Sequence, residues 1–260
     1  MRGKLLGLKI REFALGPRRR LNSNENSSSY SNSFTALIGP TKRSFMLHTE
    51  MVTKYSAYFA KALSGSWAES SNNTIELDDV DPQLFQLFVD WVYSGRLELR
   101  ESSDRESFLI HAWALGDRLI TPRFKNAVIN ALQYTWAKFD DGFPHSFDLA
   151  VLAYELSPAQ SKLRQLVIDK FSSHTCSAVV PREGRPLSSE LAFDLARAMS
   201  SLLVRLRRGE ITADSLGGTF DDEDVCHYYH EHEDGDDECS LEEIRSSVCI
   251  ATVETYADSV

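Results

Sequence analysis

The segment from residue 81 to residue 95 constrains the fold most, because its sequence predicts a helix with both ends defined. Asp81 is a good N-cap residue, and Pro82 follows at the first helical position, where its missing N–H is harmless. Gly95 is typical of the residue that ends a helix. Five apolar residues between these ends share one face: Leu84, Leu87, Phe88, Trp91 and Val92. A face this wide has to pack on a core, so the helix predicts a folded domain around it.

Short strand-prone runs precede this helix. Residues 34–38 stop at Gly39-Pro40, a turn signal, and residues 45–47 resume the pattern, which predicts a hairpin. Residues 74–77 alternate between apolar and polar side chains and predict another strand. Between the hairpin and that strand, aromatic and apolar residues at helical spacing predict a helix over residues 55–63.

Helices dominate the rest of the chain. A short alternating strand at Leu97 and Leu99 precedes two amphipathic helices over 108–119 and 124–136. Beyond residue 140 the pattern is helical, with apolar faces over 147–156, 163–171 and 191–206. The last of these helices carries five apolar residues on one stripe: Leu191, Leu195, Ala198, Leu202 and Leu206.

The net charge of −10 over 260 residues is concentrated at one end of the chain. Residues 221–260 hold 14 of the 38 acidic residues and one of the 28 bases, so residues 1–220 carry only +3. We therefore predict a nearly neutral folded body that is followed by an acidic, disordered tail over residues 217–260. Residues 1–32 mix basic residues with Ser and Asn and are predicted to form a disordered arm.

Composition also bears on the compartment. No run approaches 18 consecutive apolar residues, so no membrane-spanning helix is expected, and the first residues lack the apolar core of a secretory signal. Four cysteines in a chain of this length do not make a disulfide framework and favour a reducing compartment. We expect the chain in the cytoplasm, the nucleus or both. A transit peptide, suggested by the Arg and Ser content of the first residues, is the alternative.

The order of these elements resembles that of a BTB/POZ domain. The residues that carry the resemblance are the run 34–40, Phe45, His48, the run 55–59, Trp67, Glu69, the run 74–79, Asp81, Pro82, Phe85, Phe88, Trp91, Tyr93, Gly95 and the run 114–119. The resemblance covers residues 34–135. The sequence is most similar to the fungal BTB-domain proteins that lack kelch repeats and zinc fingers.

The resemblance implies an α+β fold, a small β-sheet with a cluster of helices, at residues 33–138. An all-α extension over residues 139–216 and the acidic tail would follow it. The family role is protein–protein association: self-association as a homodimer and, in many members, docking to a cullin scaffold. The resemblance thus implies an adaptor that brings an unknown protein substrate to a cullin-based ubiquitin ligase. The alternative is a nuclear regulator that gathers transcription or chromatin partners through the same domain.

Two sets of interface residues follow from the resemblance. Cullin-binding members of the family carry an apolar-x-Glu motif before the third strand, and Trp67 and Glu69 occupy that place here. Alternatively, Trp67 packs on the helices of its own domain. Tyr55, Tyr58 and Phe59 would line the homodimer interface, or they belong to the core.

Cysteine and histidine residues gather in the acidic tail. Cys226, His230, His232 and Cys239 offer two thiolates and two imidazoles, the ligand set of a tetrahedral zinc site. The acidic residues around them would raise the local affinity for cations. Their spacing is not a usual zinc spacing, however, and the segment shows no hydrophobic mini-core of its own. A solvated acidic tail without metal is therefore the alternative. His227 is expected to take no part in a site.

Other kinds of function find little support in the sequence. The chain has no Gly-x-Ser-x-Gly elbow and no Gly-rich phosphate loop, so we expect no enzyme and no cofactor besides zinc. A body of charge +3 without a recognition motif does not favour direct nucleic-acid binding, and the acidic tail would repel phosphates. No membrane partner is expected either.

Overall fold

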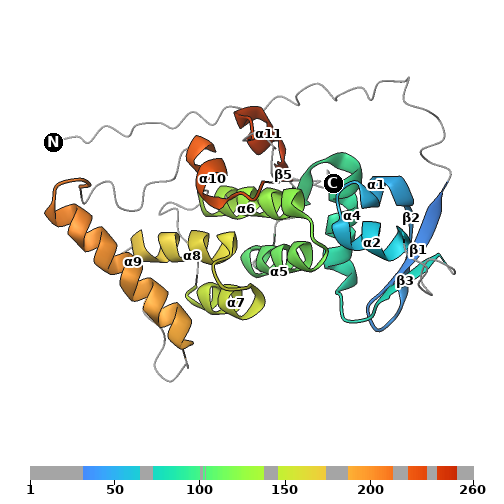
Figure 1. Ribbon diagram of the computed structural model, residues 1–260, viewed down its shortest axis with the longest axis horizontal. Coiled ribbons are helices and arrows are strands. Elements are labelled where there is room, and N and C mark those ends of the chain that lie inside the picture. The colour runs from blue at the N-terminus through green and yellow to red at the C-terminus, as the bar shows by residue number, and fades with distance from the viewer. Residues whose placement is uncertain are drawn as a thin grey trace, which may run out of the picture.

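The computed structural model describes residues 32–64, 73–99, 102, 104–137, 146–173, 187–212, 222–232 and 239–250. Figure 1 shows a small sheet at one end of an elongated molecule, a long helix at the other end, and the remaining helices between them. The strands are β1 (Ser33–Ile38), β2 (Arg43–His48), β3 (Thr74–Leu77), β4 (Leu97–Leu99) and β5 (Val248–Ile250). The helices are α1 (Thr49–Thr53), α2 (Ala57–Ser64), α4 (Pro82–Ser94), α5 (Arg105–Arg118), α6 (Pro122–Ala137), α7 (Asp148–Leu156), α8 (Lys162–Ser173), α9 (Ser189–Arg207), α10 (Asp222–Tyr229) and α11 (Leu241–Ser246).

The larger sheet has three strands in the order β2-β1-β3. β1 and β2 form the predicted antiparallel hairpin, and Gly39 in its turn has a φ of 73°, which glycine adopts readily. β3 runs parallel to β1. Parallel neighbours need a crossover connection, and α1 and α2 lie in the stretch of chain that makes it.

The predicted helix over 81–95 is confirmed as α4. Its N-cap Asp81 accepts a hydrogen bond from the Gln83 backbone N–H at 2.6 Å, and its C-cap Gly95 has a φ of 71°. The apolar face is buried except for Leu84, which is half-buried and packs against the core. The face meets the other aromatic residues of the domain, and the Phe88 ring stacks on that of Phe59 with centroids 6.3 Å apart. The α4 face thus joins the sheet and α2 in one core.

α6 is the central helix of the structure. Every residue from Phe124 to Leu132 is buried, because α5 packs on one side of the helix while α10, α11 and β5 contact it elsewhere. Figure 1 shows α6 between α5 and the two helices of the C-terminal region. A helix covered in this way joins parts of the chain that lie far apart in sequence.

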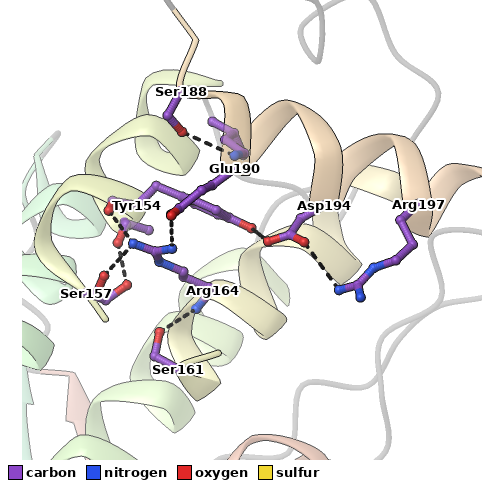
Figure 2. Close-up of polar contacts among 10 residues, drawn as sticks. Tyr154, Ser157, Ser161, Arg164, Ser188, Glu190, Asp194 and Arg197 are labelled. Atoms are coloured by element: carbon purple, nitrogen blue, oxygen red, sulfur yellow. Dashed lines mark hydrogen bonds and ion pairs between the residues drawn. The ribbon is translucent and has the colours of Figure 1, made fainter. Parts of the chain in front are cut away.

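α7, α8 and α9 form the predicted helical extension, joined in part by polar contacts (Figure 2). The apolar stripe predicted for α9 packs on the core only in its first half. Leu191 is fully buried and Leu195 and Ala198 pack against the core, but Leu202 and Leu206 do not contact it. The reason is geometric: α7 and α8, the helices that α9 packs on among the described residues, lie beside its first half, and its second half extends beyond them. Neither α9 nor any other helix in the described ranges is long and apolar enough to cross a membrane.

The prediction of a disordered tail is wrong for residues 222–232 and 239–250, which we call the C-terminal segment. They form α10, α11 and β5, and β5 pairs in parallel with β4. The physical reason is that a few well-placed apolar residues bury themselves against the helices: Val225, Tyr229 and Ile244 are 4%, 1% and 6% exposed. High average acidity does not prevent this burial. The predicted disordered arm at residues 1–32 lies outside the described residues except for Asn32.

Candidate functional site

The four predicted metal ligands converge in the C-terminal segment. One ligand atom from each of Cys226, His230, His232 and Cys239 lies within 4.8 Å of the others. We call these four residues the Cys/His cluster. Cys226 and His230 are buried, Cys239 is half-buried, and His232 is exposed. His227, which we expected to take no part, is exposed and is not a member of the cluster.

Two distances within the cluster are close to those around a tetrahedral ion. Cys226 Sγ lies 3.2 Å from His232 Nε2, and His230 Nδ1 lies 3.4 Å from Cys239 Sγ. Zinc–ligand bonds of about 2.0–2.3 Å at a tetrahedral centre place neighbouring ligand atoms roughly 3.3–3.8 Å apart. Two thiolates and two imidazoles fill all four positions of such an ion. A site filled by protein ligands has no open position for a substrate, which is typical of a structural metal rather than a catalytic one.

Local structure explains how an unusual spacing closes into one cluster. Cys226 lies in the last turn of α10, and the backbone N–H of His230 donates to its carbonyl at 3.2 Å, so these two residues share one face. The chain then leaves the helix and brings His232 back towards Cys226. Cys239 precedes α11, where Ser240 and Glu243 form a capping box that fixes the start of the helix. The Cys239 N–H also donates to Cys226 Sγ at 3.1 Å.

Burial and neighbouring groups set the protonation states of His230 and Cys239. Burial, with His232 and Lys162 nearby, lowers the pKa of His230 to about 4, so its imidazole is neutral at ordinary pH. A neutral imidazole is the form that binds a metal. Burial and the adjacent Cys226 raise the pKa of the Cys239 thiol to about 12. A metal ion bound here would therefore replace a thiol proton.

α6 supports the cluster through two asparagines that the sequence analysis missed. The side chain of Asn126 accepts from the Glu231 N–H and donates to the Glu231 carbonyl, both at 2.8 Å. Asn130 Oδ1 accepts a hydrogen bond from His230 Nε2 at 2.8 Å. Because Nε2 carries the proton in that bond, the lone pair of the ring is on Nδ1, the nitrogen near Cys239. The available signal was the pair of asparagines four residues apart inside an apolar helix, where asparagine has low propensity.

The hydrophobic surroundings of the cluster also come from outside it. The acidic segment has no hydrophobic mini-core in its own sequence, and contact with the body supplies one, because Val225 and Tyr229 join the main core cluster. The Tyr229 hydroxyl donates to Asp169 of α8 at 2.9 Å, and Lys162 Nζ donates to the Tyr228 carbonyl at 2.7 Å. The Cys/His cluster is thus built against α6 and α8 rather than in an independent zinc module.

The predicted interface residues lie elsewhere. Trp67 and Glu69, the cullin-docking residues, are outside the described residues. Phe59 is fully buried in the core between the rings of Phe34 and Phe88. Tyr55 and Tyr58 pack on the same core while remaining partly exposed, so these two tyrosines have surface to offer a partner.

Comparison with known proteins bears on the first half of the chain. Residues 23–135 match the BTB/POZ domain. A BTB/POZ domain-containing protein of Arabidopsis thaliana is 34% identical over 74 residues, which make up 28% of this chain and 9% of that protein. Kelch repeat and BTB domain-containing protein 4 of Homo sapiens and of Mus musculus is 33% identical over 66 residues, 25% of this chain and 12% of each relative. The matched part is about a tenth of each relative's own length, and the Cys/His cluster lies beyond the region matched by the BTB/POZ domain.

Proposed function

Because the chain carries a BTB/POZ domain, a fold that generally serves protein–protein interaction, we propose that it acts as a homodimeric adaptor that brings a protein substrate to a cullin-based ubiquitin ligase. The observation that carries this proposal is the match over residues 23–135 together with the α+β core that those residues form. BTB domains associate with themselves and with other proteins. A non-enzymatic role is the natural one for such a fold, so we expect no catalytic activity.

The dimer is proposed to form around α2. Tyr55 and Tyr58 offer partly exposed aromatic surface there, and aromatic residues are enriched in protein interfaces. Sedimentation at micromolar concentration should show a dimer for the full chain and a shift towards monomer for Tyr58→Asp. Tyr134→Asp, which alters another exposed tyrosine on α6, should leave the dimer intact. A monomeric wild-type chain would refute self-association.

The cullin contact is proposed to use Trp67 and Glu69. A large aromatic side chain makes a good anchor at an interface, and a neighbouring carboxylate can accept charge-assisted hydrogen bonds. Pull-down with a purified cullin N-terminal region should therefore succeed with the wild type and fail with Trp67→Ala/Glu69→Ala. A matched control is Phe193→Ala/Glu155→Ala, which removes one exposed aromatic and one exposed acid from the helical extension. Equal binding by the two double variants would refute the assignment.

The substrate-binding part of the adaptor is proposed to lie outside the BTB/POZ domain, and α9 is the best candidate in the described ranges. Phe193, Met199 and Leu203 are 67%, 45% and 56% exposed on this helix. We further propose that the chain works in the cytoplasm or nucleus, since four cysteines in 260 residues do not make a disulfide framework and favour a reducing compartment. A dimer that localises to nuclei and binds no cullin would instead favour the nuclear regulator.

The Cys/His cluster is proposed to bind one zinc ion. Its support is the convergence of four ligand atoms of the types that zinc prefers, with His230 held in the right tautomer by Asn130. Elemental analysis of the full chain, purified without chelator, should find about one zinc per chain. Cys226→Ser should lose this zinc, whereas the neighbouring His227→Ala should keep it. Equal zinc content in the two variants would show that the ligand set is wrong.

A further inference from the structure

The C-terminal segment is connected to the BTB/POZ domain through buried polar side chains on one helix, α6. Lys125, Asn126 and Asn130 are 6%, 6% and 8% exposed. Lys125 Nζ pairs with Glu231 at 2.5 Å and with Asp117 of α5 at 2.8 Å. Asn126 binds both backbone groups of Glu231, the residue that lies between the ligands His230 and His232. Three contacts with Glu231, two of them to its backbone, therefore fix the chain between these two ligands to the domain.

Asn130 extends this connection to strand β5. While its Oδ1 accepts from His230, its Nδ2 donates to Ser247 Oγ at 3.0 Å. Ser247 directly precedes β5, and its carbonyl accepts from the backbone N–H of Leu97 in β4 at 2.8 Å. A continuous chain of hydrogen bonds thus runs from a metal ligand, through one side chain of α6, to the strand of the BTB/POZ domain that β5 covers.

The strand pair at the end of this chain cannot be stable by itself. β4 and β5 pair over three residues each, with Leu97 opposite Val248 and Leu99 opposite Ile250. A two-stranded sheet is marginal in water even when it is longer than this. Something must hold β5 at β4, and the nearest fixed points that precede it in the chain are α11 and the Cys/His cluster.

We propose that metal binding by the Cys/His cluster holds the C-terminal segment on α6 and thereby keeps β5 paired with β4, with Asn130 as the positioning residue between the two. This inference rests on the proposed zinc site and adds the function of that site. With zinc bound, His230 is fixed, Asn130 is fixed by His230, and Ser247 is fixed by Asn130. Without zinc, the segment separates from α6 and the backbone edge of β4 is left unpaired, while the sheet of β1, β2 and β3 stays folded.

Hydrogen exchange of the full chain, with zinc measured in the same samples, tests the proposal. Stripping zinc with a chelator should cause loss of amide protection in β4 and β5 but not in β1, β2 or β3. Unchanged protection in β4 and β5 after zinc has been removed would overturn the proposal and leave the zinc site standing. Loss of protection throughout the domain would also overturn it, because the metal would then hold the whole fold. A wild-type chain that binds no zinc would refute the zinc site itself, and this inference with it.

Variants of Asn130 test its positioning role apart from folding. Asn130→Leu removes both hydrogen bonds at similar volume and should weaken zinc binding by about 10–100-fold in competition with a chelator. Asn130→Asp keeps an acceptor for His230 and should restore most of the affinity. Gln133→Leu is the matched control, since it removes a side-chain amide from the same helix. The Nε2 atom of that amide has no hydrogen-bond partner among the described residues. Equal zinc affinity for Asn130→Leu and Gln133→Leu would show that Asn130 does not position the ligand.

Discussion

Arg164 of α8 should contribute more than any neighbouring side chain to the junction of α7, α8 and α9. Figure 2 shows its guanidinium among groups from all three helices. Nη2 donates to the carbonyls of Tyr154 and Ser157 at 2.8 and 2.7 Å, and Nη1 donates to Glu190 at 2.7 Å. Because α7 ends at Leu156, the two carbonyls belong to the end of that helix, where backbone acceptors lack intrahelical partners. Arg164 supplies those partners and a positive charge that the helix end favours.

The size of the effect of Arg164→Met follows from these contacts. A hydrogen bond from a charged group contributes about 1.5–3 kcal/mol, and two of them are lost here. The guanidinium also lies 4.4 Å from the centroid of the Tyr154 ring, a cation–π contact that adds about 1 kcal/mol. The ion pair with Glu190 adds at most about 0.5 kcal/mol because the Glu190 side chain is 64% exposed. Against this stands about 2 kcal/mol of side-chain entropy, which leaves a net loss of about 4 kcal/mol.

Hydrogen exchange of α7 and α9 is the suitable assay. The four tryptophans, at positions 67, 91, 113 and 136, all precede the helical extension, so their fluorescence would report on the BTB/POZ domain instead. Arg164→Met should lower the opening free energy of α7 and α9 by about 4 kcal/mol. Arg197→Met is the control: its side chain is 73% exposed and pairs with Asp194 at 3.2 Å, so it should cost under about 0.5 kcal/mol. If Glu190→Gln destabilised the junction as much as Arg164→Met, the exposed ion pair would be the main contribution and our account of the carbonyls would be refuted.

Variants at three further positions test a helix cap, a close helix contact and a buried charge. Asp81→Ala should lower the free energy of unfolding by about 1 kcal/mol in urea titrations followed by tryptophan fluorescence, whereas Asp81→Asn keeps the acceptor and should not; equal midpoints would exclude the cap. Gly116→Val should cost about 2 kcal/mol, since a Cβ at that position would lie 2.9 Å from side-chain carbons of both Phe124 and Lys125; an unchanged urea midpoint would show that α5 and α6 separate without cost. Burial lowers the pKa of Lys170 to about 8 from 10.5, so the unfolded chain binds more protons between these pH values and stability should rise with pH across that window. In thermal melts below pH 8, the free energy of unfolding of Lys170→Met should exceed that of the wild type by up to about 3 kcal/mol, and the two should converge above pH 10.5. A difference that stays constant with pH would show that the buried charge of Lys170 is not its cause.

Local signals in the sequence were sufficient for most of the BTB/POZ domain. The Asp81 cap, the Gly95 end and the apolar face between them depend on neighbouring residues alone, and each is found in α4 as predicted. The hairpin around Gly39 is of the same kind. The resemblance to the family, which rests on the order of such elements, agrees with the match over residues 23–135.

Features that depend on distant neighbours were not predictable in this way. The stripe of α9 has helical periodicity along its whole length, but periodicity cannot tell whether a helix extends beyond the elements that cover it. Similarly, the acidity of the C-terminal segment predicted disorder, although Val225, Tyr229 and Ile244 are placed so that they can be buried against the helices. Strand β5 has only three residues and gains its structure from β4.

The candidate metal site shows both situations. The residue types alone were sufficient to predict the four members of the Cys/His cluster as metal ligands, because few other side chains bind zinc well. Their spacing could not show convergence, since Cys239 reaches Cys226 through the start of α11. Asn126 and Asn130 lie about a hundred residues away in sequence from the groups that they bind. Only the packing of α6 against α10 and α11 reveals them.

The pairing of β4 with β5 also affects how the chain is made. β5 follows β4 by about 150 residues, since Leu97 lies opposite Val248. A ribosome that adds about 5–20 residues per second needs roughly 8–30 s to cover that distance. Within that time the hairpin, α4 and α5 are complete, whereas β4 has no partner strand and α6 lacks its cover from α10 and α11. The BTB/POZ domain therefore cannot complete the pairing of β4 or the burial of α6 until the second half of the chain has been synthesised.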